Sequence, residues 1–215
     1  MSLSLDIRLH FGNLTAEEEH VDSRVDARNA TDEALVTRAQ TGDGAAFEEL
    51  VRRYRNDVYG LSYHFLRNRE EAWDVSQEVF IKAYRSLRRF RGDAGFKTWL
   101  LRITANHCKD LFKKRRVPTV SIDAMPSQDF FPSGTDPGRA LGNSELGEAI
   151  QEALDSLSPK HRMAFVLREF EDMSYKDMAS VMECSEGTVM SRLHHARKKL
   201  QDKLSRMGFA EGGIS

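Results

Sequence analysis

The sequence predicts an all-α protein with two small helical domains joined by a flexible acidic linker. Apolar residues recur at steps of three and four along most of the chain, which is typical of amphipathic helices. Proline and glycine turn signals interrupt this pattern at residues 117–144. We therefore expect an acidic N-terminal extension at 1–30, helical domains at 31–116 and 145–206, and a tail at 207–215.

The first domain is expected to contain four helices, enough to enclose one core as a small bundle. Their apolar stripes begin at Leu35, Phe47, Ala72 and Phe96. Breaks between the stripes fall at Gly42-Asp43-Gly44, at residues 67–69 and at the turn 91–95. The order of stripes and breaks therefore predicts four consecutive helices.

The second domain is expected to be a helix-turn-helix module. A stripe from Leu146 to Leu157 precedes Ser158-Pro159, which is typical of a helix start with Ser as N-cap and Pro in the first turn. Ser174 with Asp177 resembles a capping box at the next helix. Ser185 is a good N-cap for a final helix, so two helices around a tight turn end the domain.

The formal net charge of −1 conceals alternating basic and acidic blocks. Residues 85–116 hold eleven basic and two acidic residues, a net charge of +9, and residues 185–206 carry +4. Residues 119–159 carry −6, and residues 1–33 carry −5. Two separated basic blocks are typical of a protein that binds a polyanion, and for either block alone the alternative is a solvated helix face.

Composition and motifs exclude several classes of protein. The chain has no run of about 18 apolar residues and no secretory signal, so we expect no membrane insertion. Two cysteines are too few for a disulfide framework and indicate a reducing, cytoplasmic compartment. Cys108 lies on an apolar stripe and is expected to be a buried structural thiol. Without a nucleophile elbow, phosphate loop or zinc-ligand spacing, we expect no metal, no cofactor and no enzyme.

Two groups of segments resemble the extracytoplasmic-function (ECF) branch of the bacterial sigma-70 family. The first group is DVSQEVFIKAY at 74–84, FRGD at 90–93 and TWLLRITAN at 98–106. The second group is REFEDMSY at 168–175 and GTVMSRLHHAR at 187–197. The two groups stand in the order and spacing of the family's two conserved domains.

The resemblance implies a sigma factor that brings core RNA polymerase to promoters and has no catalytic site. The implied partners are the polymerase, through the clamp of its largest subunit and its flap, promoter DNA, and an anti-sigma factor. The first domain would contact the clamp and open the promoter, and the second would read the minus-thirty-five element. The alternative is a stand-alone helix-turn-helix regulator that binds duplex DNA as a dimer.

The resemblance also implies residue roles in the first domain. Asp74, Gln77, Glu78 and Phe80 match the polymerase-contacting helix, and positions 74, 77 and 78 share one helix face. The residues implied for minus-ten DNA are Phe90, Gly92, Asp93, Trp99, Arg102, Asn106, Lys109 and Lys113. An aromatic ring and an amide suit an unstacked base, and basic residues suit phosphates. For Phe90 and Trp99 a place in the core is the alternative, and it is favoured for Trp99. For Asn106 the alternative is a helix-interior residue bonded to the backbone. His107 is expected to face DNA or solvent.

The residues implied for the minus-thirty-five element lie on the last helix, except for Arg168, which precedes the helix-turn-helix. They are Arg168, Thr188, Met190, Ser191, Arg192, His194, His195 and Arg197. Met190 and His195 depart from the family's pattern of basic residues and remove bidentate contacts to guanine or phosphate. The histidine pair could also make DNA binding sensitive to pH.

The N-terminal extension alternates apolar and polar residues from Leu3 to Phe11, which is strand periodicity. We interpret it as a tail that pairs with a partner or covers a basic face of the free protein.

Overall fold

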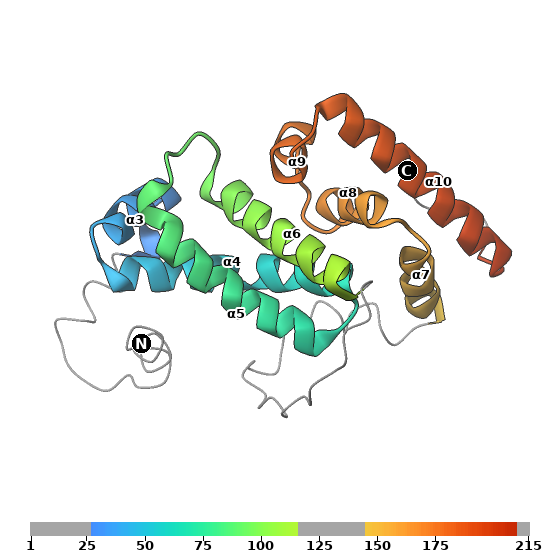
Figure 1. Ribbon diagram of the computed structural model, residues 1–215, viewed down its shortest axis with the longest axis horizontal. Helices are drawn as coiled ribbons and strands as arrows, with labels where there is room; N and C mark the ends of the chain where they lie inside the picture. The colour runs from blue at the N-terminus through green and yellow to red at the C-terminus, as the bar shows by residue number, and fades with distance from the viewer. Residues whose placement is uncertain (1–26, 116–144, 210–215) are drawn as a thin grey trace. The chain divides into compact units, whose positions relative to one another are not determined.

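The computed structural model describes residues 27–115 and 145–209, and every element in these ranges is helical (Figure 1). This confirms the predicted all-α class. The chain divides into two compact units, residues 1–52 and 53–215. The predicted linker, most of the N-terminal extension and its strand-like alternation lie outside the described residues.

The first helices begin and end where short polar residues satisfy free backbone groups. Helix α3 (Asp32–Gln40) starts at Thr31, whose hydroxyl accepts a hydrogen bond from the Ala34 amide at 3.3 Å. Gly42 follows its end with a φ of +104°, a conformation that glycine adopts without steric cost. Helix α4 (Gly44–Leu66) then starts at Asp43, whose carboxylate accepts from the Ala46 amide at 3.1 Å.

The next break falls where the sequence predicts it. Arg67 adopts a φ of +61°, and the Asn68 side chain accepts from the Glu71 amide at 3.1 Å, which starts helix α5 (Arg69–Ser86). A 3-10 turn (Leu87–Arg89) extends α5 up to the turn predicted at 91–95. Helix α6 (Phe96–Arg115) follows that turn.

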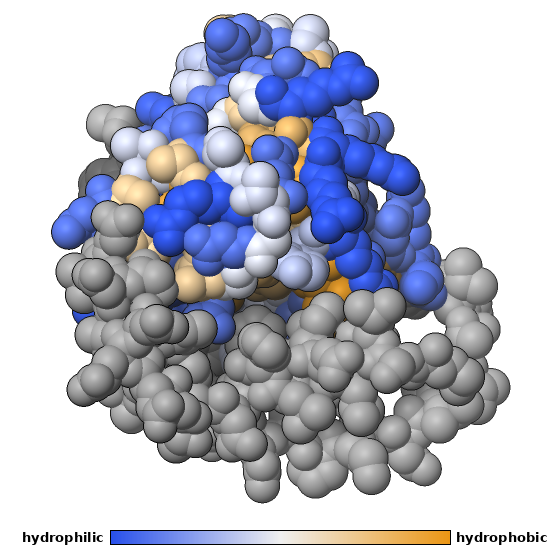
Figure 2. All heavy atoms as spheres, turned by 90° about the vertical axis from the view of Figure 1, so that its left-hand side faces the viewer, coloured by the Kyte–Doolittle hydropathy of each residue, from blue (hydrophilic) through white to orange (hydrophobic). Residues whose placement is uncertain are grey.

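Helices α5 and α6 pack against each other through apolar faces. The buried residues of α5 include Val75, Val79 and Ala83, and those of α6 include Leu100 and Ala105. This packing turns the polar face of α5 outward. The face of the molecule drawn in Figure 2 is mainly hydrophilic, and its apolar side chains show only in small patches. Within the described ranges no helix is long and apolar enough to cross a membrane.

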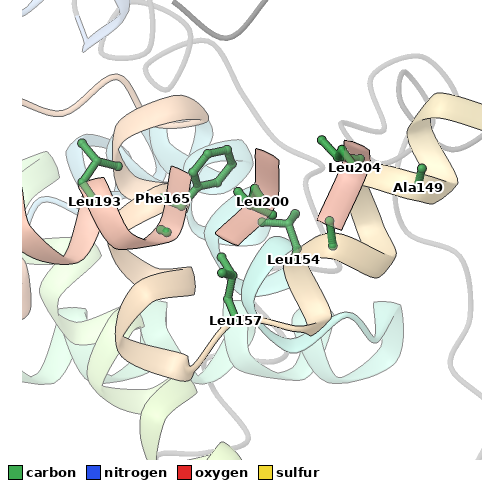
Figure 3. Packing of buried hydrophobic residues seen from close by; sticks show 9 residues of the cluster. Ala149, Leu154, Leu157, Phe165, Leu193, Leu200 and Leu204 are labelled. Carbon is green, nitrogen blue, oxygen red and sulfur yellow. The ribbon is translucent and has the colours of Figure 1, made fainter. Parts of the chain in front are cut away.

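The C-terminal helices α7 (Glu145–Asp155), α8 (Pro159–Glu169) and α10 (Glu186–Arg206) share an apolar core. Helix α9 (Tyr175–Met182) packs against α8 and α10. Figure 3 shows Leu154 of α7 and Leu157, which follows the end of that helix, directed toward Phe165 of α8 and Leu200 of α10. Burial of each such side chain contributes about 1.5–3 kcal/mol. The core therefore fixes α10 against its neighbours and leaves the opposite side of that helix exposed.

Two of the three predicted helix starts in this part of the chain carry the expected cap. The hydroxyls of Ser174 and Ser185 accept hydrogen bonds from the amides of Asp177 and Thr188, at 3.1 and 3.2 Å. Ser158 has the backbone of an N-cap but makes no side-chain capping bond, so α8 relies on Pro159 at its first turn. Glu183 ends α9 in the left-handed conformation, with a φ of 53°.

Candidate functional site

An exposed polar face runs along α5. Asp74, Gln77 and Glu78 are exposed on this face, whereas the positions between them are buried. Phe80 is only 8% exposed and belongs to the buried side, next to Val79. The structure therefore groups on one face three of the four residues that the resemblance assigned to polymerase binding. The fourth, Phe80, belongs to the core beneath that face.

The electrostatics of this face are coupled to α6. Burial, then the nearby charges of Glu78 and Glu70, raise the pKa of Asp74 above its ordinary value. His107 of α6 lies 3.4 Å from Glu78, and its ring contacts the ammonium group of Lys82. The His107 side chain is 12% exposed, and burial and Lys82 lower its pKa. The expectation that His107 faces DNA or solvent is wrong, because α5 covers it.

An aromatic cluster stands at the turn before α6. The ring centroids of Phe90 and Trp99 lie 4.9 Å apart, and that of Phe96 lies 5.6 Å from Trp99. Phe96 is buried, whereas Phe90 and Trp99 are half-buried. The two outer rings therefore pack on the core and keep exposed surface on which a further ring could stack. Beside them Gly92, with a φ of +78°, and Asp93 are exposed.

Asn106 lies further along α6 in a polar chain of contacts. The Lys109 ammonium donates to its side-chain oxygen at 2.9 Å, and the Asn106 amide donates to Glu183 Oε1 at 3.3 Å. Burial is the main cause that lowers the pKa of Lys109, and Glu183 opposes it. Arg102 is half-buried, and Lys113 is exposed on the same helix.

Helix α6 packs against α9, and two of its polar side chains bond acidic residues there. The Thr98 hydroxyl donates to Asp177 Oδ1 at 3.2 Å, and Asn106 bonds Glu183 as described above. Both bonds join residues more than 70 positions apart. Sequence reasoning missed Asp177 and Glu183 as partners of α6, because no local pattern reports a contact at this separation.

An ionic cluster with one buried member lies beside this contact. The Lys97 ammonium is 2.5 Å from an Asp57 oxygen and 3.8 Å from a Glu171 oxygen. The Glu171 side chain is 6% exposed, and burial, followed by the charge of Asp57, raises its pKa to about 8. Gly60 lies directly beside this carboxylate, because a Cβ atom there would stand 3.4 Å from Glu171 Oε1, which is an ordinary van der Waals distance.

Arg162 of α8 links the start of that helix to the end of α4. Its Nη1 donates to the carbonyl of Phe65 at 2.9 Å, and its Nη2 lies 3.3 Å from Asp155. The residue is 6% exposed. Nearby, the His64 ring stacks on Phe170 with centroids 3.9 Å apart, and burial lowers the pKa of His64 to about 4. The guanidinium group of Arg162 is thus paired with groups inside the protein.

The outward side of α10 carries four exposed residues that a ligand can reach. Met190 is 47% exposed, and Ser191, His194 and His195 are exposed around it. The N-terminus of the helix, capped by Ser185, lies one turn away and favours an anion. These side chains form the outward surface of the predicted reading helix.

Four of the other predicted DNA contacts are held by neighbours in the structure. Arg197 donates to Glu169 Oε1 through Nε at 3.1 Å and Nη2 at 2.7 Å. Arg168 donates to the Met173 carbonyl at 2.9 Å, and Arg192 Nη1 lies 3.4 Å from Cys184 Sγ. The Thr188 hydroxyl lies 2.9 Å from that of Ser185. These contacts position the side chains and would be exchanged if DNA bound there.

Cys108 is fully buried, and burial raises its pKa to about 12, so the expected structural thiol is confirmed. Within residues 27–115 and 145–209 no group of three or more His, Cys, Asp or Glu side chains is arranged to hold a metal ion.

Comparison with known proteins places the chain in a family. The RNA polymerase sigma-H factor of Pseudomonas aeruginosa is 40% identical over 180 residues, which cover 80% of this chain and 93% of that protein. The ECF RNA polymerase sigma-E factor of Escherichia coli K12 is 39% identical over 181 residues, covering 81% and 94%. The chain belongs to the ECF branch of the sigma-70 family.

Both conserved regions of this sigma factor are matched separately. The family model for Sigma-70 region 2 matches residues 50–117, and the model for Sigma-70, region 4 matches residues 147–200. We call the corresponding parts region 2 and region 4. The α5 face and the aromatic cluster lie in region 2, and the helix-turn-helix lies in region 4.

Solved structures share the fold of this chain. CnrH in complex with the cytosolic domain of CnrY is 26% identical, with a TM-score of 0.60, covering 81% of this chain and 97% of that one. The sigma factor RpoE in complex with the anti-sigma factor NepR, from Bartonella quintana, shares the fold, with 24% identity, a TM-score of 0.57, and coverage of 74% and 96%. The alternative of a stand-alone regulator is set aside, because this chain carries both sigma regions.

Proposed function

We propose that this ECF sigma factor binds core RNA polymerase through α5, opens the minus-ten element with region 2 and reads the minus-thirty-five element with α10. The observation that carries the proposal is the combination, in one chain, of an exposed acidic face on α5 with an exposed reading surface on α10. A factor of this kind needs no catalytic site or cofactor, because the polymerase performs the chemistry.

The α5 face is proposed to bind the clamp of the polymerase's largest subunit. Asp74, Gln77 and Glu78 offer two carboxylates and an amide on one side of a well-packed helix, which suits a basic or polar partner surface. Burial, and then the charges of Glu78 and Glu70, raise the pKa of Asp74, and a cationic partner would relieve the repulsion between Asp74 and Glu78. From the resemblance to the family, we propose that region 4 binds the flap of the polymerase.

Region 2 is proposed to hold a base flipped out of the minus-ten element. Phe90 and Trp99 supply partly exposed rings for stacking, and Asn106 supplies an amide for the polar edge of the base. Arg102, Lys109 and Lys113 lie on α6 with Asn106, and Gly92 and Asp93 lie in the turn before it, so these residues are proposed to contact the DNA strand next to the base. The Asn106 amide must exchange Glu183 for the base, so this contact with α9 would open when DNA binds.

Region 4 is proposed to place α10 in the major groove. Met190, Ser191 and His194 would face base edges, and Arg168, Thr188, Arg192, His195 and Arg197 would contact the flanks. The Met190 side chain can make apolar contact with a thymine methyl group but cannot donate to guanine. We therefore expect a minus-thirty-five element that is not read by a basic residue at this position.

We also propose that an anti-sigma factor binds this protein. Two proteins of similar fold, RpoE and CnrH, were solved in complexes, one with an anti-sigma factor and one with the cytosolic domain of CnrY. The exposed α5 face is a suitable target, because a partner seated there would compete directly with the polymerase.

In vitro transcription tests the proposed function. Purified protein is added to core RNA polymerase on a pooled promoter library, and the transcript starts are sequenced. We expect discrete starts that share two spaced elements and that require both proteins. The double change Asp74→Ala and Gln77→Ala should lower the affinity for core polymerase by about tenfold or more, as for interface hot spots. Glu33→Ala, an exposed acid in the first turn of α3, is the matched control. Duplex binding by the protein alone, with no starts, would overturn the proposal.

A further inference from the structure

A basic hollow lies between the start of α8 and the middle of α10. It has a volume of about 470 Å³, and its lining comprises His161, His195, Lys198, Lys199 and Asp202. The ring centroids of His161 and His195 are 5.9 Å apart, although the residues are 34 positions apart in the chain. On α10, positions 195, 199 and 202 follow each other at steps of four and three, so they share one flank of the helix.

The electrostatics of the hollow favour an anion. Two lysines and two histidines face a single carboxylate, so the net charge of the lining is +1 with neutral histidines and +3 with both protonated. Burial, followed by the charges of Lys199, His195 and Arg192, lowers the pKa of His161. The charged groups that act on His161 thus lie on α10. The His161 Nδ1 atom is also buried and has no hydrogen-bond partner in the described part of the chain.

We propose that this hollow binds one phosphate of the promoter DNA backbone at the edge of the minus-thirty-five element, with His161 and Lys199 as its positioning residues. A helix in the major groove has a sugar-phosphate strand along each flank, and phosphates fix the register of the helix on the duplex. The bases would be read from the outward surface at Ser191 and His194, and the flank that includes His195 and Lys199 would meet one of these strands. The inference rests on the proposed function of α10.

The hollow includes one residue that does not belong to α10. His161 belongs to α8, and its ring forms a second wall of the hollow opposite His195. A bound phosphate would oppose the repulsion from Lys199, His195 and Arg192 and would raise the pKa of His161. Proton uptake would therefore accompany binding, and the affinity for DNA would rise as the pH falls through the histidine range.

The test uses holoenzyme made from the full chain and core polymerase, on a promoter duplex found in the transcription assay. Single phosphates flanking the minus-thirty-five element are replaced one at a time by neutral methylphosphonates. In the wild type, one replacement should weaken binding by about three- to tenfold. With Lys199→Gln the same replacement should cost less than about twofold, because the charge it would have met is absent. The slope of log K against log salt should also fall by about 0.9 for Lys199→Gln.

Two further variants separate charge from folding. Lys160→Gln removes an exposed lysine next to His161 that does not line the hollow, so it should keep the wild-type response to every methylphosphonate. His161→Gln keeps a polar side chain but cannot be protonated, so the gain in affinity between pH 7.5 and pH 6 should shrink while the thermal midpoint is retained. Competition by inorganic phosphate at constant ionic strength shows whether the hollow binds a free anion instead of the DNA backbone.

The outcomes are distinct. Coupling between Lys199 and one particular phosphate supports the inference. If wild-type holoenzyme binds the promoter but His161→Gln, Lys199→Gln and Lys160→Gln behave alike, the inference is overturned and the proposed function stands. The inference is also overturned if millimolar inorganic phosphate saturates the hollow and no methylphosphonate position shows coupling to Lys199. A wild-type holoenzyme that binds no promoter overturns the proposed function itself.

Discussion

The Asn106 amide donates a hydrogen bond to Glu183, so the residue proposed to hold a flipped base is bound by an acidic residue of the helix-turn-helix. The carboxylate of Glu183 also acts on Lys109, which bonds the oxygen of the same asparagine. In the free protein the polar edge of the base site is therefore occupied by an anion. Single-stranded DNA must displace that anion before it can bind.

Glu183→Gln is expected to strengthen binding of single-stranded minus-ten DNA to the free protein. The change weakens the hold on Asn106 and Lys109, and an exposed charge pair of this kind gives about a two- to fivefold effect. Fluorescence anisotropy with a labelled oligonucleotide measures it. Glu186→Gln, an exposed acid in the first turn of α10, controls for the change in net charge. An equal gain in both variants would assign the effect to net charge and contradict the competition.

Arg162→Met is expected to lower the free energy of unfolding by about 2 kcal/mol. The variant fills a similar volume but leaves the Phe65 carbonyl without its side-chain donor and removes the ion pair with Asp155. Urea unfolding followed by circular dichroism measures the change. Lys160→Met, two positions away and exposed, should alter stability by less than about 0.5 kcal/mol. Equal stability of the two variants would show that the buried guanidinium contributes nothing.

The fold could be predicted from local signals, because helix breaks are made by residues close in sequence. Asn68, Ser174 and Ser185 mark their helix starts through short polar side chains that bond amides three residues on. The buried position of Phe80 could also have been found. It lies beside Val79 and three residues before Ala83, on the buried side of the same helix.

The contacts between region 2 and region 4 could not be predicted in this way. Thr98 meets Asp177, and Asn106 meets Glu183, only because α6 packs against α9. Likewise, the separation of His161 and His195 in sequence conceals their proximity. Sequence periodicity indicates which face of a helix is apolar, but it does not indicate which other helix covers that face.

The two cysteines are expected to react at very different rates. Cys108 is fully buried and its pKa is raised to about 12, so at neutral pH it is a thiol that reagents reach only when the protein opens. Cys184 is half-buried beside Arg192. Titration with a chromogenic disulfide should label one thiol in the native protein and a second one in denaturant. Cys184→Ser should abolish the native reaction, and rapid labelling of that variant would contradict the burial of Cys108.

Glu171 is expected to make the protein less stable as the pH rises. Its ordinary pKa is 4.5, and burial with Asp57 raises it to about 8 in the folded protein. Between these values the folded protein holds a proton that the unfolded chain has lost. The free energy of unfolding therefore falls as the pH rises through this window, by at most about 1.4 kcal/mol per pH unit, and this contribution is constant above the window.

Replacement of Glu171 by glutamine should flatten this dependence, because glutamine stays neutral at every pH while keeping nearly the same shape beside Gly60 and Lys97. Urea unfolding at pH 5.5, 6.5, 7.5 and 8.5 measures the slope for each protein. Asp172→Asn is the matched control, since Asp172 is the exposed neighbour and asparagine tolerates its φ of 47°. The control should keep the wild-type slope. If Glu171→Gln also keeps it, the pH dependence arises elsewhere, and Glu171 is ionised in the folded protein with Lys97 as its counter-ion.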